Sequence, residues 1–338
     1  MASATSVTFH IHFETRRTRA VVFRMTTELI DAAKSRSGMS DIHTTLGSDL
    51  ADLTPLATAN ALVTSNDVLR DPKFPLRDLL RQAPNLQWIH INGAGIEPLL
   101  PLDWLPDRIR LTNNSGVHVE KLREFALMAL LMMHARLPAM MTNQRESRWE
   151  QIFTPRIKGR TVLVIGVGHM GGTVAEAAKS LGCRVLGIRM RGAPHPHVDR
   201  MFREDELDQV LPQADIVVLS VPVTPRTKLL MNRERFALMK PGAAFMNIGR
   251  AASIDHEVLA EVLKSGTLSG AVIDVHEREP LPSTSPLWRT PNLVITPHVS
   301  SDDAENYMPK TMDIVFENAR RLRSGEALKN VVDPVRGY

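Results

Sequence analysis

Three side chains suited to polar chemistry follow short apolar runs in the second half of the chain. Arg250 follows AAFMNIG, Glu279 lies in VHEREP just after GAVIDV, and His298 ends NLVITPH. If these runs are parallel strands, their carboxyl ends lie at one edge of a sheet, where open α/β folds bind ligands. Each residue alone also fits a surface charge or a capped core histidine. Their convergence on one edge favours a functional site.

An arginine, a carboxylate and a histidine suit the reduction of a 2-keto acid to a 2-hydroxy acid. The arginine fork can hold the substrate carboxylate. A protonated imidazole can donate to the carbonyl oxygen as hydride arrives, and a neighbouring carboxylate favours the imidazolium. The turn at 93–95 can present backbone N–H groups to the same substrate carboxylate. We expect catalysis from Arg250, Glu279 and His298, and substrate binding by Arg250, Ala94 and Gly95.

A nucleotide-binding loop is indicated by the stretch VLVIGVGHMGG, which begins at Val162. Gly166, Gly168 and Gly171 lie between an apolar strand and the helix former TVAEAAKSLG, the order that a dinucleotide-binding unit needs. The pyrophosphate would lie at the helix N-terminus, where free N–H groups and the helix dipole favour negative charge. Flavin and S-adenosylmethionine sites use similar loops, so the glycines alone do not specify the cofactor.

The cofactor preference is predicted from IRMR, the end of the next strand. NAD enzymes usually have Asp or Glu there, about 20 residues after the loop, to bind the ribose 2′-hydroxyl. Arg189 takes that place, with Arg191 close behind. An arginine attracts a 2′-phosphate that a carboxylate would repel, although a solvated pair of charges is the alternative. We therefore expect NADP(H) to be favoured over NAD(H).

The pattern of apolar runs predicts an α/β fold of two doubly wound domains. A Rossmann-type cofactor domain at 117–301 would be inserted in a flavodoxin-like substrate domain at 1–116 and 302–338, with the active-site cleft between them. We expect a helix over 119–137, ended by Pro138, and a final helix over about 303–323. Further predicted elements are strands in 7–13, 61–65, 86–93, 162–165, 183–192, 215–222, 243–249, 270–275 and 292–298, and a helix in 76–84.

Composition excludes several other classes of protein. The chain has 338 residues, is 43% hydrophobic and carries a net charge of +4 without a basic block, which disfavours nucleic acid as a partner. Cys183 is the single cysteine, so no internal disulfide can form, and its apolar neighbours indicate a packed thiol. The longest apolar run, 125–133, is too short to cross a bilayer. We expect a cytoplasmic protein without a membrane segment or a metal site.

Taken together, the motifs resemble those of the D-isomer-specific 2-hydroxyacid dehydrogenases, in particular glyoxylate/hydroxypyruvate reductase-like members. The matching stretches are WIHINGAGIEPLL, VIGVGHMGG, VPVTPRTKLLMN, MKPGAAFMNIGR, LSGAVIDVHEREPLP and SPLWRTPNLVITPH. Arg250-Ala251 departs from the family's usual Arg-Gly. The resemblance implies that Arg250 binds substrate, Glu279 partners His298, and His298 is the acid/base.

The resemblance also implies cofactor contacts and an assembly. A homodimer would form through the helix at 119–137 and the arm that follows, about 119–158 in all. Asp274 would lie near the nicotinamide carboxamide. The full set of expected cofactor-binding residues is Gly166, Gly168, His169, Met170, Gly171, Arg189, Arg191, Val221, Pro222, Thr227, Ile248, Gly249, Arg250, Asp274, His298 and Ser300.

The leading prediction is thus an NADP(H)-dependent 2-ketoacid reductase that acts on a small acid such as glyoxylate or hydroxypyruvate. The alternative from another class is an NAD(H)-binding, corepressor-like sensor without significant turnover, which the arginine at 189 and the absence of a long disordered tail disfavour. Formate oxidation is disfavoured because that branch has glutamine at the position of Glu279. Phosphoglycerate oxidation is disfavoured because we expect no regulatory domain after Tyr338.

Overall fold

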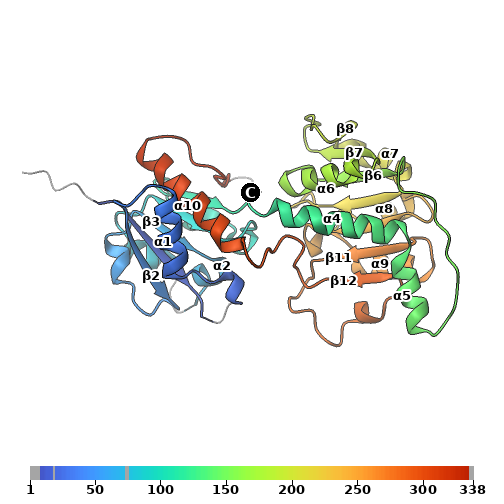
Figure 1. Cartoon of the computed structure of the whole chain (residues 1–338), viewed down its shortest axis with the longest axis horizontal. Helices are drawn as coiled ribbons and strands as arrows, with labels where there is room; N and C mark the ends of the chain where they lie inside the picture. Colours follow the sequence, from blue (N-terminus) through green and yellow to red (C-terminus); the bar gives the residue numbers. More distant parts are fainter. Residues whose placement is uncertain (1–7, 18–19, 73–75, 335–338) are drawn as a thin grey trace, which may run out of the picture. The chain divides into compact units, whose positions relative to one another are not determined.

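A computed structural model describes residues 8–17, 20–72 and 76–334, and the chain divides into two compact units (Figure 1). Unit 1 comprises Met1–His118 and Asp303–Tyr338, and unit 2 comprises Val119–Asp302. Unit 2 is thus an insertion in unit 1, and the chain crosses between them twice. The sequence placed these crossings at 116/117 and 301/302.

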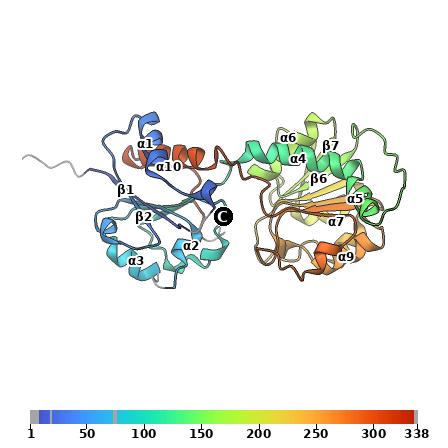
Figure 2. The ribbon, with the colours of Figure 1, turned by 60° about the horizontal axis from the view of Figure 1, so that its bottom comes forward.

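Unit 1 is built on a five-stranded parallel sheet in the order β2-β1-β3-β4-β5. This is the flavodoxin-like order of a doubly wound sheet. Helices α1 and α10 lie on one side of the sheet, and α2 and α3 on the other (Figure 2). The elements are β1 (His10–Thr15), α1 (Thr27–Arg36), β2 (His43–Ser48), β3 (Ala61–Thr64), α2 (Asn66–Leu69), α3 (Leu76–Gln82), β4 (Trp88–Ile91), β5 (Arg110–Asn113) and α10 (Tyr307–Arg323).

Apolar side chains on both faces of this sheet make two cores. Ile11 and Phe13 of β1 are fully buried against Met312 and Phe316 of α10. Leu62 of β3 belongs to the other core, under α2 and α3. Burial of both faces explains why the central strands are nearly continuous apolar runs, as parallel strands between helices usually are.

Unit 2 is built on a seven-stranded parallel sheet in the order β12-β11-β10-β9-β6-β7-β8. The order reverses at β6, as in a Rossmann fold. Its elements are α4 (Val119–His134), α5 (Leu137–Arg145), β6 (Thr161–Ile165), α6 (His169–Ser180), β7 (Arg184–Arg189), β8 (Arg200–Arg203), α7 (Leu207–Val210), β9 (Ile216–Leu219), α8 (Arg233–Leu238), β10 (Ala244–Asn247), α9 (His256–Lys264), β11 (Gly270–Ile273) and β12 (Leu293–Ile295).

The predicted fold class is confirmed, and the differences from the sequence prediction lie at particular elements. Each predicted strand overlaps an observed one; β1 extends two residues beyond the predicted 7–13 and β6 begins one residue before the predicted 162–165, while residue 7 lies outside the described residues. The strands β2, β5 and β8 were not predicted. Pro138 was wrongly expected to end a helix. Helix α4 stops at His134, and Pro138 lies in the first turn of α5, where a missing N–H breaks no helical hydrogen bond.

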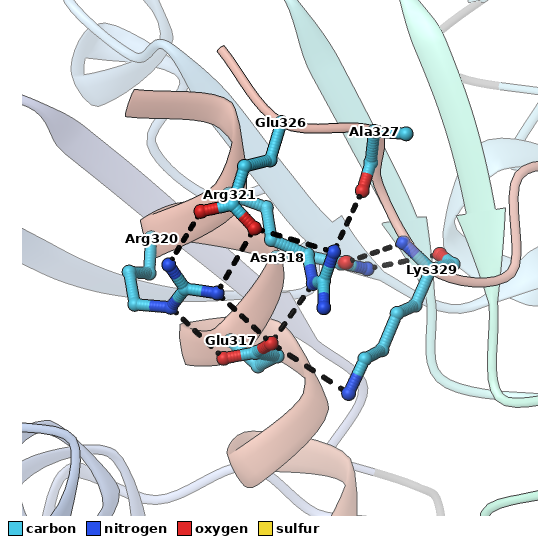
Figure 3. Close-up of polar contacts among 7 residues, drawn as sticks. All are labelled: Glu317, Asn318, Arg320, Arg321, Glu326, Ala327 and Lys329. Atoms are coloured by element: carbon cyan, nitrogen blue, oxygen red, sulfur yellow. Dashed lines mark hydrogen bonds and ion pairs between the residues drawn. The ribbon is translucent and has the colours of Figure 1, made fainter. Parts of the chain in front are cut away.

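The segment after α10 is fastened to that helix by polar contacts (Figure 3). The buried Asn318 amide donates to the Lys329 carbonyl oxygen at 3.1 Å and accepts from the Lys329 N–H at 2.8 Å. Glu317 accepts from Arg320 and Arg321, and hydrogen bonding to Arg320 lowers the pKa of Glu317 to about 2. These contacts hold the segment up to Lys329 against α10.

Cys183 is buried, and burial raises the pKa of its thiol. No single helix in the described ranges is long and apolar enough to cross a membrane. Helices α4 and α5 are long and apolar enough only when taken together, and the chain bends by 67° between them. The apolar face of α4 is part of the unit 2 core, where Leu122, Ala126 and Leu130 are fully buried.

Candidate active site

The three expected catalytic residues follow three neighbouring strands of unit 2. Arg250 lies three residues after β10, Glu279 six residues after β11, and His298 three residues after β12. These strands pair in parallel, β10 with β11 and β11 with β12, so their carboxyl ends lie at the same edge of the sheet. This is the edge at which open α/β sheets bind ligands.

His298 and Glu279 are in direct contact. The Nδ1 atom of His298 lies 2.8 Å from Oε2 of Glu279. Burial raises the pKa of Glu279, but hydrogen bonds from His298 and from the His276 N–H outweigh it and leave this pKa below its ordinary value. The ionised carboxylate can only accept, so Nδ1 of His298 carries the proton. Nε2 is then the ring nitrogen left for chemistry, and about half of this side chain is exposed.

A buried aspartate fixes the turn that carries His298. Asp274 is fully buried directly after β11, and Oδ1 accepts from the Thr296 hydroxyl at 2.6 Å and the Val299 N–H at 3.0 Å. Oδ2 accepts from the Ser300 N–H at 3.0 Å. Three donors on both sides of His298 thus hold this residue in the left-handed region, with φ of 57°.

The turn that carries Arg250 is held by the fully buried Asn247, the last residue of β10. Its Oδ1 accepts from the Gly249 N–H at 3.0 Å, and its Nδ2 donates to the Arg250 carbonyl oxygen at 3.1 Å. The Arg250 Nη1 donates to the Gly249 carbonyl oxygen at 2.9 Å. The guanidinium therefore extends from a braced backbone at the strand edge.

The glycine loop has the shape expected of a dinucleotide cradle. Gly166 has φ of +93°, and a Cβ there would lie 2.7 Å from Val221 Cγ1. A Cβ on Gly171 would clash with the Gly166 carbonyl oxygen, whereas one on Gly168 would meet open space. The loop is thus packed on its inner side and open at Gly168, the N-cap of α6. The N–H groups of the first α6 turn have no partners within the helix and can receive a pyrophosphate.

Arg189 ends β7 beside this loop. Its Nε donates to the Val167 carbonyl oxygen, and its Nη1 lies 3.4 Å and 3.5 Å from the carbonyl oxygens of Pro194 and Ala193. These contacts orient the guanidinium at the glycine loop. Arg191 is exposed two residues further on. The described residues thus place two cations, and no carboxylate, at the end of β7.

The other expected cofactor residues all belong to unit 2. Val221 follows β9, and Gly249 lies so close to it that a Cβ on Gly249 would be 2.8 Å from the Val221 carbonyl oxygen. The Thr227 hydroxyl donates to the Pro222 carbonyl oxygen at 2.6 Å. Ile248 and Ser300 are buried at the same strand edge, and His169 and Met170 open α6.

Ala94 and Gly95 belong to unit 1, in the turn after β4. Ala94 is exposed, and Gly95 is half-buried. Their carbonyl oxygens accept from two asparagine side chains, from Asn113 at 2.7 Å and from Asn66 at 2.8 Å. Their role in substrate binding stays a prediction.

Sequence reasoning missed the residues that brace these turns. The Ser220 hydroxyl donates to the Gly166 carbonyl oxygen at 2.7 Å. The His276 N–H donates to the Glu279 carboxylate, and Nε2 of His276 contacts the Thr296 carbonyl oxygen. Asn247 and Thr296 were missed as well. Their position in the sequence could have indicated these residues, because each lies at or within three residues of a strand end. In the part of the chain that the structure describes, no group of three or more His, Cys, Asp or Glu side chains is placed to hold a metal ion.

Comparison with known proteins finds similarity to a family of dehydrogenases. Residues 127–300, more than half of the chain, match the family model described as D-isomer specific 2-hydroxyacid dehydrogenase, NAD binding domain. A glyoxylate/hydroxypyruvate reductase A from Photorhabdus laumondii is 30% identical, and the match covers 78% of this chain and 85% of that protein.

Two solved structures extend the likeness to almost the whole chain. A D-isomer specific 2-hydroxyacid dehydrogenase from Xanthobacter autotrophicus in complex with NADPH and MES has a TM-score of 0.82 at 28% identity, over 98% of this chain and all of that one. An NADPH-dependent glyoxylate/hydroxypyruvate reductase from Sinorhizobium meliloti, in complex with NADP and sulfate, has a TM-score of 0.78 at 25% identity, over 98% and 100%.

The hydrogen bonds of Asp274 predict the effect of removing its charge. In Asp274→Asn, one carboxylate oxygen becomes an NH2 group that cannot accept from the facing N–H or hydroxyl. We expect the free energy of unfolding to fall by about 2 kcal/mol in urea denaturation. Amide hydrogen exchange at Val299 and Ser300 should quicken. The control Thr296→Val removes one donor, and we expect about half that loss. Unchanged exchange at both amides in Asp274→Asn would contradict this account of the turn.

Proposed function

The chain belongs to the D-isomer-specific 2-hydroxyacid dehydrogenase family, and we propose that it is an NADPH-dependent reductase of small 2-keto acids such as glyoxylate or hydroxypyruvate. At the coarser level it is an NAD(P)-dependent 2-hydroxyacid oxidoreductase. The observation that carries the proposal is the His298–Glu279 contact of 2.8 Å at the strand edge that also carries Arg250 and the glycine loop.

The proposed reaction consumes one 2-keto acid, one NADPH and one proton, and yields the 2-hydroxy acid and NADP+. The bound nicotinamide supplies the hydride that reduces the keto carbon. Arg250 binds the substrate carboxylate through its guanidinium and so orients the keto group. His298 donates the proton from Nε2 to the carbonyl oxygen. Glu279 accepts from Nδ1 and so keeps the imidazole ring oriented.

The preference for NADPH is supported by Arg189 and Arg191. The contacts of Arg189 with the carbonyl oxygens of Val167, Ala193 and Pro194 engage Nε and Nη1. This leaves Nη2 for a 2′-phosphate, which arginine binds well. Two of the similar structures carry NADPH or NADP. The lone, buried Cys183 fits the reducing cytoplasm in which we place the protein.

A homodimer is part of the proposal, because large apolar side chains are exposed on α4 and in the arm after α5. Trp149 is 93% exposed and Phe153 85%, while Met128 and Leu131 of α4 are close to half exposed. Exposed apolar groups of this size usually mark an interface. We propose that the second subunit covers them. The active-site cleft that we predict between the substrate and cofactor domains is likewise part of the proposal.

A panel of 2-keto acids, offered first with NADPH and then with NADH, tests the function. Turnover is followed by the loss of absorbance at about 340 nm, where the reduced nicotinamide absorbs.

In His298→Ala we expect kcat to fall by about 10²–10⁴-fold, because the general acid is lost. The affinity for NADPH should stay largely intact. His43→Gln, an exposed histidine at the start of β2 in unit 1, is the matched control. Near-normal turnover by His298→Ala would remove His298 from the mechanism. A wild-type protein that binds NADPH but reduces no keto acid favours the sensor alternative.

Cofactor choice is tested with Arg189→Ala. Loss of a charged hydrogen bond to the 2′-phosphate should lower kcat/KM for NADPH by about tenfold to a hundredfold and leave the value for NADH almost unchanged. Arg184→Ala, at the opposite end of β7, is the control for a lost charge on that strand. Equal use of NADPH and NADH by the wild-type protein would contradict the proposal that Arg189 gives a preference for NADPH.

The subunit contact is tested with the double substitution Trp149→Ser and Phe153→Ser. We expect the wild-type protein to sediment as a dimer and the double variant to shift towards a monomer, because the buried apolar area of both rings is lost. Trp288→Ser is the control, since Trp288 is another exposed tryptophan, at 48%, but lies outside α4 and the arm. A monomeric wild-type protein at micromolar concentration would refute the dimer.

A further inference from the structure

The turn at 93–95 in unit 1 has every carbonyl oxygen tied to the protein body. The Gly93 carbonyl oxygen accepts from the Asn114 N–H at 3.0 Å. The Ala94 carbonyl oxygen accepts from Nδ2 of Asn113 at 2.7 Å, and that of Gly95 accepts from Nδ2 of Asn66 at 2.8 Å. Three successive peptide planes are therefore fixed by three asparagines.

Fixing the carbonyl groups also fixes the N–H groups. In a trans peptide the N–H points opposite to the carbonyl oxygen of the residue before it. The N–H groups of Ala94, Gly95 and Ile96 must therefore point away from the asparagines. Within the described ranges no backbone or side-chain group accepts from these three N–H groups. The Gly93 and Ala94 carbonyl oxygens both face residues at the end of β5, so the Ala94 and Gly95 N–H groups both point away from that strand, and successive N–H groups of this kind form an anion-binding concavity.

The two asparagine side chains come from different elements and are themselves constrained. Asn113 is the last residue of β5 and is 5% exposed, and its Oδ1 accepts from the Ser115 N–H at 3.0 Å. Asn66 opens α2, and its Oδ1 is buried without a partner among the described residues. An unpaired buried carbonyl is unfavourable. The Asn66 side chain therefore keeps its hydrogen bond to Gly95 although its own Oδ1 lacks one, which lowers the stability of the folded chain.

We infer that Asn66 and Asn113 are positioning residues that hold the turn at 93–95 in the form that binds the substrate carboxylate. This inference rests on the proposed function and deepens it, because it names the groups that determine carboxylate affinity in unit 1. The asparagines do not touch the substrate. They act through the peptide planes of residues 94–96, and the N–H groups of Ala94 and Gly95 receive the carboxylate oxygens.

The first test is Asn113→Asp, which keeps the acceptor for the Ser115 N–H but sets a carboxylate against the Ala94 carbonyl oxygen. At pH 8 we expect KM for the keto acid and Ki for oxalate, a small dicarboxylate without a reducible carbonyl, both to rise about tenfold. The value of kcat should change less than about twofold, because ground state and transition state lose the same contact. The Kd for NADPH should be unchanged, since the glycine loop belongs to unit 2.

The pH dependence separates positioning from general damage. As the pH falls from 8 to 5, the introduced carboxyl group takes up a proton and can again donate to the Ala94 carbonyl oxygen. The ratio of the oxalate Ki of Asn113→Asp to that of the wild-type protein should therefore fall as the pH falls. A ratio that is constant across this range would overturn the positioning role of Asn113.

A matched control and a second variant complete the experiment. Asn85 also donates Nδ2 to a loop carbonyl oxygen in unit 1, that of Ala57 at 3.1 Å, so Asn85→Asp makes the same chemical change away from the turn. We expect no effect from it. If Asn113→Asp does not fold, Asn66→Ala, at a half-buried position, replaces it, with a rise of about fivefold expected in both constants.

The inference and the proposed function fail differently. Wild-type-like KM and Ki in both Asn66→Ala and Asn113→Asp would overturn the inference while turnover upholds the proposed function. If the wild-type protein reduces no keto acid, the proposed function fails, and oxalate binding is measured by calorimetry. Binding that Asn113→Asp weakens about tenfold still supports the carboxylate-holding turn. Equal binding by both proteins overturns it.

Discussion

The geometry of this protein depends on how backbone polar groups are satisfied where parallel strands end. A strand that leaves a sheet has N–H and carbonyl groups that the ladder no longer pairs, and they must find partners. Here polar side chains at the strand ends supply them. Ser220 follows β9, Asn247 ends β10, Asp274 follows β11, and Asn113 ends β5. The turns that carry the candidate site residues are therefore rigid before any ligand arrives.

Most of the architecture could be predicted because buried parallel strands are continuous apolar runs. The strand from Thr161 to Ile165 is one, and the glycines after it reveal the turn and the helix. The strands β2 and β8 escaped prediction because both lie at sheet edges and have the mixed sequences HTTLGS and RMFR. No residue of β2 is buried and only Phe202 of β8 is, so no apolar run marks either strand. Pro138 was misread because the same residue that ends a helix also favours the first turn of the next.

The candidate site was predictable where a reactive side chain follows a strand, as Arg250, Glu279 and His298 do. Their sequence separation is large, and only the parallel order of β10, β11 and β12 brings their strand ends to one edge. The bracing residues could not be predicted, because asparagine, serine and threonine in turns usually satisfy their own local backbone or water. Asn66 donates a hydrogen bond to Gly95, 29 positions away, and the sequence around Asn66 does not indicate this partner.

The insertion of unit 2 has a consequence for biosynthesis. The core of unit 1 around Ile11 and Phe13 is closed by Met312 and Phe316 of α10, near the other end of the chain. A nascent chain therefore completes every strand of both sheets before it can cover this face. The N-terminal unit, although most of it is translated first, therefore cannot complete its core until α10 has been synthesised, unlike a domain whose residues are contiguous in the chain. Helix α1 covers part of this face, and the rest is covered only once translation has passed residue 323.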